Sequence, residues 1–127
     1  MLCVFCHVFD DYFLQGCLAN LKQKSWWDKQ LEHETEVDKT YYSHDYIMAL
    51  VCHAMSWSVS IMVPLIYTQP HKQLFYVVAF VINTALHAWV DDLKANRRIL
   101  NLVQDQYIHF LQIIITVLSW NYLDRFY

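Results

Sequence analysis

The sequence predicts an all-α protein, a four-helix transmembrane bundle. Hydrophobic residues make up 57% of the 127 residues and charged residues only 17%. Soluble domains carry roughly 45–50% hydrophobic and about 25% charged residues. The chain has one Gly and two Pro, too few turn residues for a β-sandwich or a nucleotide-binding α/β fold. A soluble four-helix bundle with an unusually apolar core is the alternative.

Four apolar runs define the expected helices of this single domain, residues 1–127. They cover about residues 1–22, 45–67, 73–95 and 104–123. The run 46–67 has no formal charge and meets the ~20 residues that a membrane span needs. Asp10 and Asp11 interrupt the first run. The polar segment between the first two helices carries Trp26 and Trp27, which favours a short interfacial helix or polar loop there.

The distribution of charged residues predicts the orientation of the chain in the membrane and limits the classes of partner that it can bind. The first and third connections hold seven basic residues and the opposite side two, so the positive-inside rule places both termini outside a bacterial inner membrane. A net charge of −3 gives no basic field for nucleic acid. The expected partner is therefore the lipid bilayer, with a homo-oligomer as a further option.

Ionisable residues inside the apolar runs follow a regular spacing. Three His/Asp pairs have members four residues apart, so each pair shares one helix face. Polar groups inside membrane spans are costly and indicate functional sites. The pairs are His7 with Asp11, His87 with Asp91, and Asp105 with His109; Gln15 and Asn83 extend the first two, and His53 stands alone in the second run.

These residue types predict a metal site. Imidazole and carboxylate are ligands of zinc, manganese and iron, and helical bundles bind metals through such side chains from facing helices. A cation would also offset the cost of burying several carboxylates together. The alternative is that each histidine is a hydrogen-bonded core residue. The set predicts one or two divalent ions held by His7, Asp11, His53, His87, Asp91, Asp105 and His109.

A second motif overlaps the first pair. Cys3, Cys6 and His7 match the C-x-x-C-H string of covalent haem attachment. No export signal precedes the string, and the His/Asp stripe already accounts for His7, so the metal site is the preferred assignment.

The same residues resemble a known family, the domain-of-unknown-function family 3307 of small bacterial and phage membrane proteins. More distantly, the chain resembles membrane-bound metal-dependent hydrolases. Tyr12 stands where the family has Phe, and Asp10 adds a carboxylate beside Asp11, so either could be the ligand. The matching positions are His7, Asp11, Leu14, Gln15, His53, Asn83, His87, Asp91, Lys94, Asp105, Gln106 and His109.

A metal-dependent hydrolase of a phosphoester or lipid-linked substrate at the cytoplasmic leaflet is the expected function. The metal would acidify a water, and a carboxylate of Asp10, Asp11, Asp91 or Asp105 would act as general base. Lys94 would hold a phosphate, and Gln15, Asn83 and Gln106 would orient ligands or substrate. The alternatives are a metal-ion or proton transporter and a non-catalytic membrane interaction protein.

Overall fold

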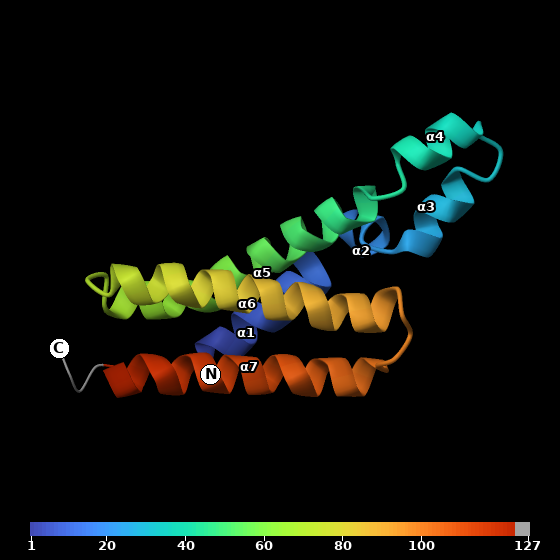
Figure 1. The fold of residues 1–127 in the computed structure, drawn as a ribbon. Coiled ribbons are helices and arrows are strands. Elements are labelled where there is room, and N and C mark those ends of the chain that lie inside the picture. Colours follow the sequence, from blue (N-terminus) through green and yellow to red (C-terminus); the bar gives the residue numbers. More distant parts are fainter. Residues whose placement is uncertain (124–127) are drawn as a thin grey trace.

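The computed structural model describes residues 1–123, and within them every regular element is a helix. Three long helices, α5 (Asp45–Thr68), α6 (Gln73–Ala95) and α7 (Leu102–Leu123), run along one another (Figure 1). The shorter N-terminal helix α1 (Leu2–Phe9) packs against α5 and α7. The all-α prediction is confirmed.

The N-terminal segment differs from the single helix expected over residues 1–22. It consists of α1, a π-helical turn η1 (Asp10–Leu14) and a short helix α2 (Leu18–Leu21). Gly16 ends the first part with a φ of 48°, a left-handed conformation that glycine adopts at little cost. At 1.5 Å per residue the 13 residues 2–14 extend about 20 Å, against about 36 Å for α5.

The polar segment between α2 and α5 forms two short helices, α3 (Lys24–Gln30) and α4 (Glu36–Tyr41). They project from one end of the long helices (Figure 1). Thr35 caps α4, because its hydroxyl accepts the backbone N–H of Asp38. Asn96 joins this segment to the end of α6 by accepting the backbone N–H of Lys24 and donating to the carbonyl of Lys22.

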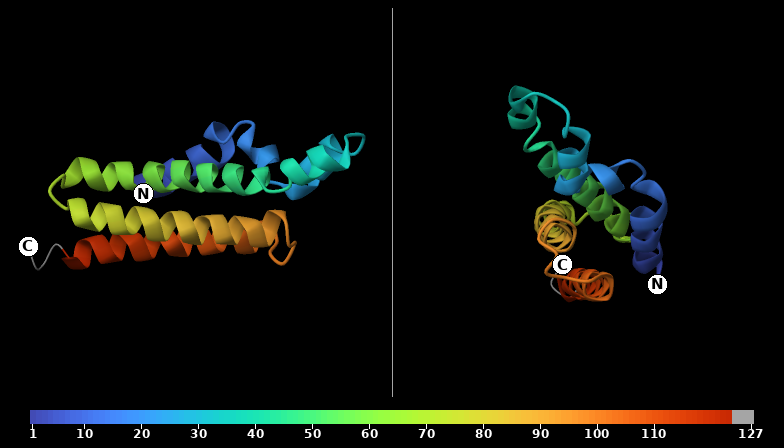
Figure 2. Two further views of the ribbon diagram at one scale, coloured as in Figure 1. Left: turned by 45° about the horizontal axis from the view of Figure 1, so that its top comes forward. Right: turned by 90° about the vertical axis from the view of Figure 1, so that its right-hand side faces the viewer.

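The interior of the bundle is divided into an apolar half and a polar half. In the right-hand view of Figure 2, α1, α5, α6 and α7 surround a common centre. The half nearer the α5–α6 loop is filled by a cluster of buried apolar residues. The other half holds buried histidines and aspartates. The apolar half includes Trp57, Ile61, Met62, Leu65, Tyr76, Ala79 and Ile113.

Among the described residues, two helical stretches are long and apolar enough to cross a membrane, by length and composition. They are Glu36–Thr68, which contains α4 and α5, and Gln73–Ala95, which is α6. The expected count of four spans is therefore not confirmed. The first expected span is broken at Gly16, and α7 carries Asp105, Gln106 and His109 near its start, which lowers its hydropathy.

Candidate metal centre

Three histidines, one from each of the three long helices, direct their Nε2 atoms at one another and at carboxylates. His53 comes from α5, His87 from α6 and His109 from α7, and none of the three is exposed. Asp11 of η1 and Asp91 of α6 lie beside them, 8% and 3% exposed. The ligand atoms form two overlapping groups within 4.8 Å, one of Asp11, His53 and His87 and one of His87, Asp91 and His109.

The spacing of these atoms suits coordination of one small cation. His53 Nε2 lies 3.2 Å from His87 Nε2 and 3.4 Å from both Asp11 Oδ1 and Asp91 Oδ2. Zinc bonds of 2.0–2.1 Å in a tetrahedron place neighbouring ligand atoms about 3.3 Å apart. His87 Nε2 is somewhat farther from the two carboxylates, at 4.0 and 3.8 Å. Asp11 and Asp91 belong to different groups of ligand atoms, so an ion held by all four side chains would draw these two carboxylates together.

Orphaned polar atoms give a second indication that a cation belongs there. The Oδ1 atoms of Asp11 and Asp105 are buried and accept no hydrogen bond from residues 1–123, although histidine Nε2 atoms lie 3.4 and 3.3 Å away. A buried acceptor without a donor costs free energy. A positive ion between the nitrogen and oxygen lone pairs would offset that cost.

Ring packing holds the histidines in place. The indole of Trp57 stacks on His87 with centroids 4.2 Å apart, and His87 lies 4.1 Å from His109. The Nδ1 atoms of these two histidines and of His53 find no hydrogen-bond partner among residues 1–123. Most metal-bound histidines instead donate their second N–H to a carboxylate or carbonyl. Here the aromatic contacts fix the ring planes.

His7, expected as a ligand, lies beside the group with both ring nitrogens already used. Trp57 donates its indole N–H to His7 Nδ1 at 2.6 Å, so Nδ1 is an acceptor and the ring proton is on Nε2. Nε2 then donates to Gln106 Oε1 at 3.1 Å. The Gln106 amide in turn donates to Asp11 and Asp105. His7 thus supports the aspartates, and the same contacts leave it no free nitrogen for a haem iron.

Two lysines contact the buried carboxylates from one end of the bundle and offset part of their negative charge. Lys22, just after α2, contacts Asp91 Oδ2 at 2.5 Å, and its side chain is 13% exposed. Lys94, at the end of α6, contacts Asp105 Oδ2 at 2.6 Å and is 32% exposed. Both ammonium groups therefore lie where the buried carboxylates open toward the outside of the bundle.

The π turn η1 buries both Asp10 and Asp11, and the two carboxylates face different parts of the bundle. Asp10 faces α5 and accepts hydrogen bonds from Ser56 at 2.7 Å and Ser60 at 3.0 Å. Asp11 faces the histidines. The geometry therefore favours Asp11 as the ligand and places Asp10 in the contact between η1 and α5.

The remaining expected site residues lie apart from the ligand atoms. Asn83 is one turn from His87 and bonds with Gln112 and Thr116 of α7. The Gln15 amide donates to the backbone carbonyl of Asp11. Asn83 therefore joins α6 to α7, and Gln15 closes the π turn.

Sequence reasoning did not single out Trp57 or Lys22. Trp57 follows His53 by four residues, so the helical stripe that carries His53 could have indicated it. Lys22 meets Asp91 from 69 positions away, and no local pattern signals such a contact.

Comparisons of the chain with family models, with curated proteins and with solved structures found no match. The resemblance to family 3307 therefore stays a prediction.

Proposed function

We propose that the chain is an integral membrane metalloenzyme that hydrolyses a phosphoester of an amphiphilic substrate at the cytoplasmic leaflet. The observation that carries the proposal is the convergence of two histidines and two aspartates at ligand-like spacing. Each further element of the proposal rests on separate contacts.

The distribution of polarity on α7 supports insertion of this helix beside the two candidate spans. Its polar residues Asp105, His109 and Gln112 are buried, while Tyr107 and Leu118 are 70% and 62% exposed. Polar groups inside and apolar groups outside suit a helix in lipid, where ionisable residues face the interior. A contiguous apolar outer surface would be a liability in water. We infer that α5, α6 and α7 cross the membrane and that α1 enters it partway.

The basic residues orient the protein. Lys22, Lys94 and Arg97 gather at the end that carries α3 and α4. By the positive-inside rule this end faces the cytoplasm of a bacterial cell, with the α5–α6 loop outside. The metal centre then lies in the cytoplasmic half.

A single divalent ion fits the charges better than two. The three buried carboxylates beside the histidines, those of Asp11, Asp91 and Asp105, and the two lysines that contact this group leave one net negative charge if the histidines are neutral. One divalent ion makes the group singly positive, whereas two would leave three positive charges in a medium of low dielectric. His87 Nε2, common to both groups, has one lone pair and binds one ion at a time. Among zinc, manganese and iron, zinc is the ion we propose, because the spacing of three ligand atoms around His53 Nε2 matches the separation of zinc ligands.

The lysines indicate an anionic substrate. Lys22 and Lys94 each contact a carboxylate that the ion would also attract. Once the ion neutralises Asp91, the ammonium group of Lys22 is available to a phosphate at the same end as a hydrogen-bond donor, and Lys94 beside Asp105 adds a second point charge. This places a phosphoester next to the proposed ion.

The chain supplies groups for the proton transfers of hydrolysis. The reaction adds water across a P–O bond, so that phosphorus gains a hydroxyl group and the departing alcohol oxygen gains the proton. A divalent ion supplies Lewis acidity and an acidified water at neutral pH. Asp105 Oδ1, which has no hydrogen-bond partner in the described part of the chain, can accept the proton from water. His109, 3.3 Å from Asp105, can pass it on.

The test combines metal analysis with a phosphatase assay. Protein purified gently in detergent should contain about one zinc per chain, and it should hydrolyse p-nitrophenyl phosphate until a chelator removes the ion. Asp91→Ala and Asp105→Ala should each abolish hydrolysis. Asp92→Ala is the matched control, because Asp92 adjoins Asp91 but pairs with Arg97 at the surface.

The outcomes separate the parts of the proposal. Hydrolysis that survives both Asp91→Ala and Asp105→Ala would refute the proposed hydrolytic activity of this site. If the purified protein neither retains zinc, manganese or iron nor takes up any of them at micromolar concentration, the proposed metal centre is refuted. A metal-loaded protein without hydrolysis, but with metal flux into liposomes, would indicate transport instead.

A further inference from the structure

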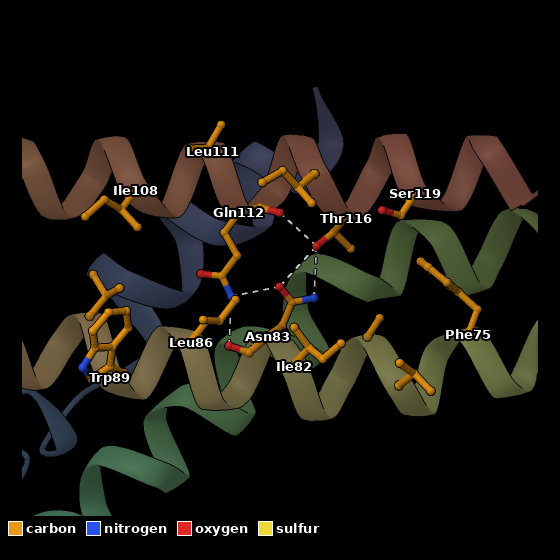
Figure 3. A pocket seen from close by; sticks show the side chains of 14 residues that line it. Phe75, Ile82, Asn83, Leu86, Trp89, Ile108, Leu111, Gln112, Thr116 and Ser119 are labelled. Carbon is orange, nitrogen blue, oxygen red and sulfur yellow. Dashed lines mark hydrogen bonds between the residues drawn. The ribbon is translucent and has the colours of Figure 1, made fainter.

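Two asparagines on α6 and at its end join this helix to other parts of the chain through their side-chain amides. Asn83 bonds with Gln112 and Thr116 of α7 (Figure 3). Asn96, the residue that follows α6, bonds instead with the turn between α2 and α3, 72 and 74 positions earlier in the chain. The first asparagine joins two long helices, and the second holds the turn that carries Lys22.

Asn96 holds the backbone on both sides of Gln23. Its Oδ1 accepts the N–H of Lys24 at 2.7 Å, and its Nδ2 donates to the carbonyl of Lys22 at 3.2 Å. Gln23 between them is extended, with φ −98° and ψ 117°, so these two backbone groups point to the same side. A carboxamide carries both the acceptor and the donor that they need. Asn96 therefore pairs with the turn in the way that a neighbouring strand would.

A second contact fixes the same turn from the side of α3. Trp27 donates its indole N–H to the carbonyl of Leu21 at 2.8 Å. The backbone is thus held at Leu21, at Lys22 and at Lys24. These bonds set the direction in which the Lys22 side chain leaves the turn.

The α6 segment contacts Lys22 at both ends of the residue. Asn96 bonds to its backbone carbonyl, and Asp91 accepts a hydrogen bond from its ammonium group at 2.5 Å. Five residues separate Asp91 from Asn96, about 7.5 Å at 1.5 Å per residue, a distance that suits the long side chain of a lysine. The position of the ammonium group therefore depends on the position of the turn, which Asn96 holds against α6.

We propose that Asn96 is a positioning residue for Lys22. By holding the turn 22–24, it keeps the Lys22 ammonium group on Asp91 in the metal-free protein, and it presents the same group to a substrate phosphate when an ion occupies the centre. A lysine on a turn that is already held loses less conformational freedom when it binds phosphate. The role toward phosphate rests on the proposed function, whereas the hold on Lys22 concerns only contacts within the chain.

The rates at which the lysines are acetylated test the hold on Lys22 without metal or hydrolysis. The whole chain, metal-free in detergent, is treated with a limiting amount of an acetylating reagent, and peptide mass spectrometry gives a rate for each lysine. Lys22 and Lys94 should react more slowly than the exposed Lys24, because each of the two contacts a buried carboxylate.

Asn96→Ala should raise the rate at Lys22 about tenfold or more, the effect expected from losing two hydrogen bonds, and leave the rate at Lys94 nearly unchanged. A general loosening of the bundle would raise both rates together, so the comparison separates positioning from a structural role. Gln23→Ala is the matched control, because the Gln23 side chain lies in the same turn but bonds to the carbonyl of Ala19 in α2. It should leave both rates nearly unchanged.

Asn96→Asp serves as a second variant if the alanine variant does not fold. It keeps the acceptor for the N–H of Lys24 and lacks the donor for the carbonyl of Lys22, so it should also raise the rate at Lys22. Unchanged Lys22 labelling in the folded Asn96 variant, or an equal rise at Lys22 and Lys94, would overturn the proposal.

Zinc and inorganic phosphate test the role toward substrate. Zinc should raise Lys22 labelling in the wild-type protein, because the ion competes for Asp91, and phosphate added afterwards should lower it again. For p-nitrophenyl phosphate, Asn96→Ala should raise KM about tenfold with kcat nearly unchanged. The same substitution should add little to the effect of Lys22→Met on KM, because the two residues act as one unit.

The outcomes distinguish this proposal from the proposed function. A rise in labelling confined to Lys22, in a protein that does not hydrolyse p-nitrophenyl phosphate, would refute the enzyme and leave the hold of Asn96 on Lys22 standing. Hydrolysis by Asn96→Ala with the wild-type KM would refute the role of Asn96 toward substrate and leave the enzyme standing.

Discussion

Replacing His53 and His7 one at a time distinguishes a ligand from a residue that supports ligands. Both side chains are completely buried, and the sequence assigns both to the metal. The structure separates them, because His53 Nε2 lies among His87 Nε2 and two carboxylates, whereas both nitrogens of His7 bind Trp57 and Gln106.

The expected magnitudes follow from that difference. Zinc binding to four-ligand sites is worth about 10–16 kcal/mol, or roughly 2.5–4 kcal/mol per ligand if shared evenly. At about 1.4 kcal/mol per tenfold change, His53→Ala should weaken zinc binding roughly 100- to 1,000-fold. His7→Ala removes a support of Asp11 and Asp105, and losses of this kind are about 10- to 100-fold.

The assay is zinc titration against a chromophoric chelator in detergent, with circular dichroism to verify helix content. His33→Ala is the control, because His33 lies exposed in the α3–α4 connection. His53→Gln serves as a second variant if the cavity left by alanine unfolds the protein. Equal losses in folded His7→Ala and His53→Ala would refute the assignment of His7 as a support, and wild-type affinity in both would refute the metal centre.

Three other changes test the surroundings of the centre. Gln106→Leu should weaken zinc binding about 10- to 100-fold by freeing the aspartates it orients, and titration against the same chelator would detect it; unchanged affinity would contradict this role. Lys22→Met leaves Asp91 without its cation, so the metal-free protein should lose about 3–5 kcal/mol of stability, with zinc restoring much of it in thermal melts; no loss would show that the pair is not stabilising. Ser60→Ala removes one of two hydrogen bonds to Asp10 and should cost about 1.5–3 kcal/mol with zinc stoichiometry unchanged; a loss of zinc would mean that Asp10 belongs to the centre.

The spacing of residues along the chain predicted which helix faces turn inward, but not what each side chain does there. A separation of four residues places His87 and Asp91 on one face whatever the partner helices are. The role of His7 depends on Trp57 and Gln106, which are 50 and 99 positions away. Such contacts are set by how the helices pack, which no local pattern specifies.

The interrupted N-terminal helix shows that the backbone conformation, too, depends on contacts that the local sequence does not specify. Asp10 and Asp11 are adjacent, and on a regular helix they would point about 100° apart. The π turn instead buries both, one against Ser56 and Ser60 and one against the histidines. The sequence left the choice between them open, because the widened turn results from tertiary contacts on both sides.

Mean hydropathy separates α7 from α5 and α6, although all three carry exposed apolar residues. The average over a helix counts Asp105, His109 and Gln112 as if they faced the surroundings, but all three point into the bundle. What matters for insertion into lipid is the outer surface, and on α7 this includes Leu111, Ile115 and Leu118. A helix that supplies site residues to the interior of a membrane protein must therefore score as less apolar than its lipid-facing surface, and the more ligands it supplies, the weaker its hydropathy signal becomes.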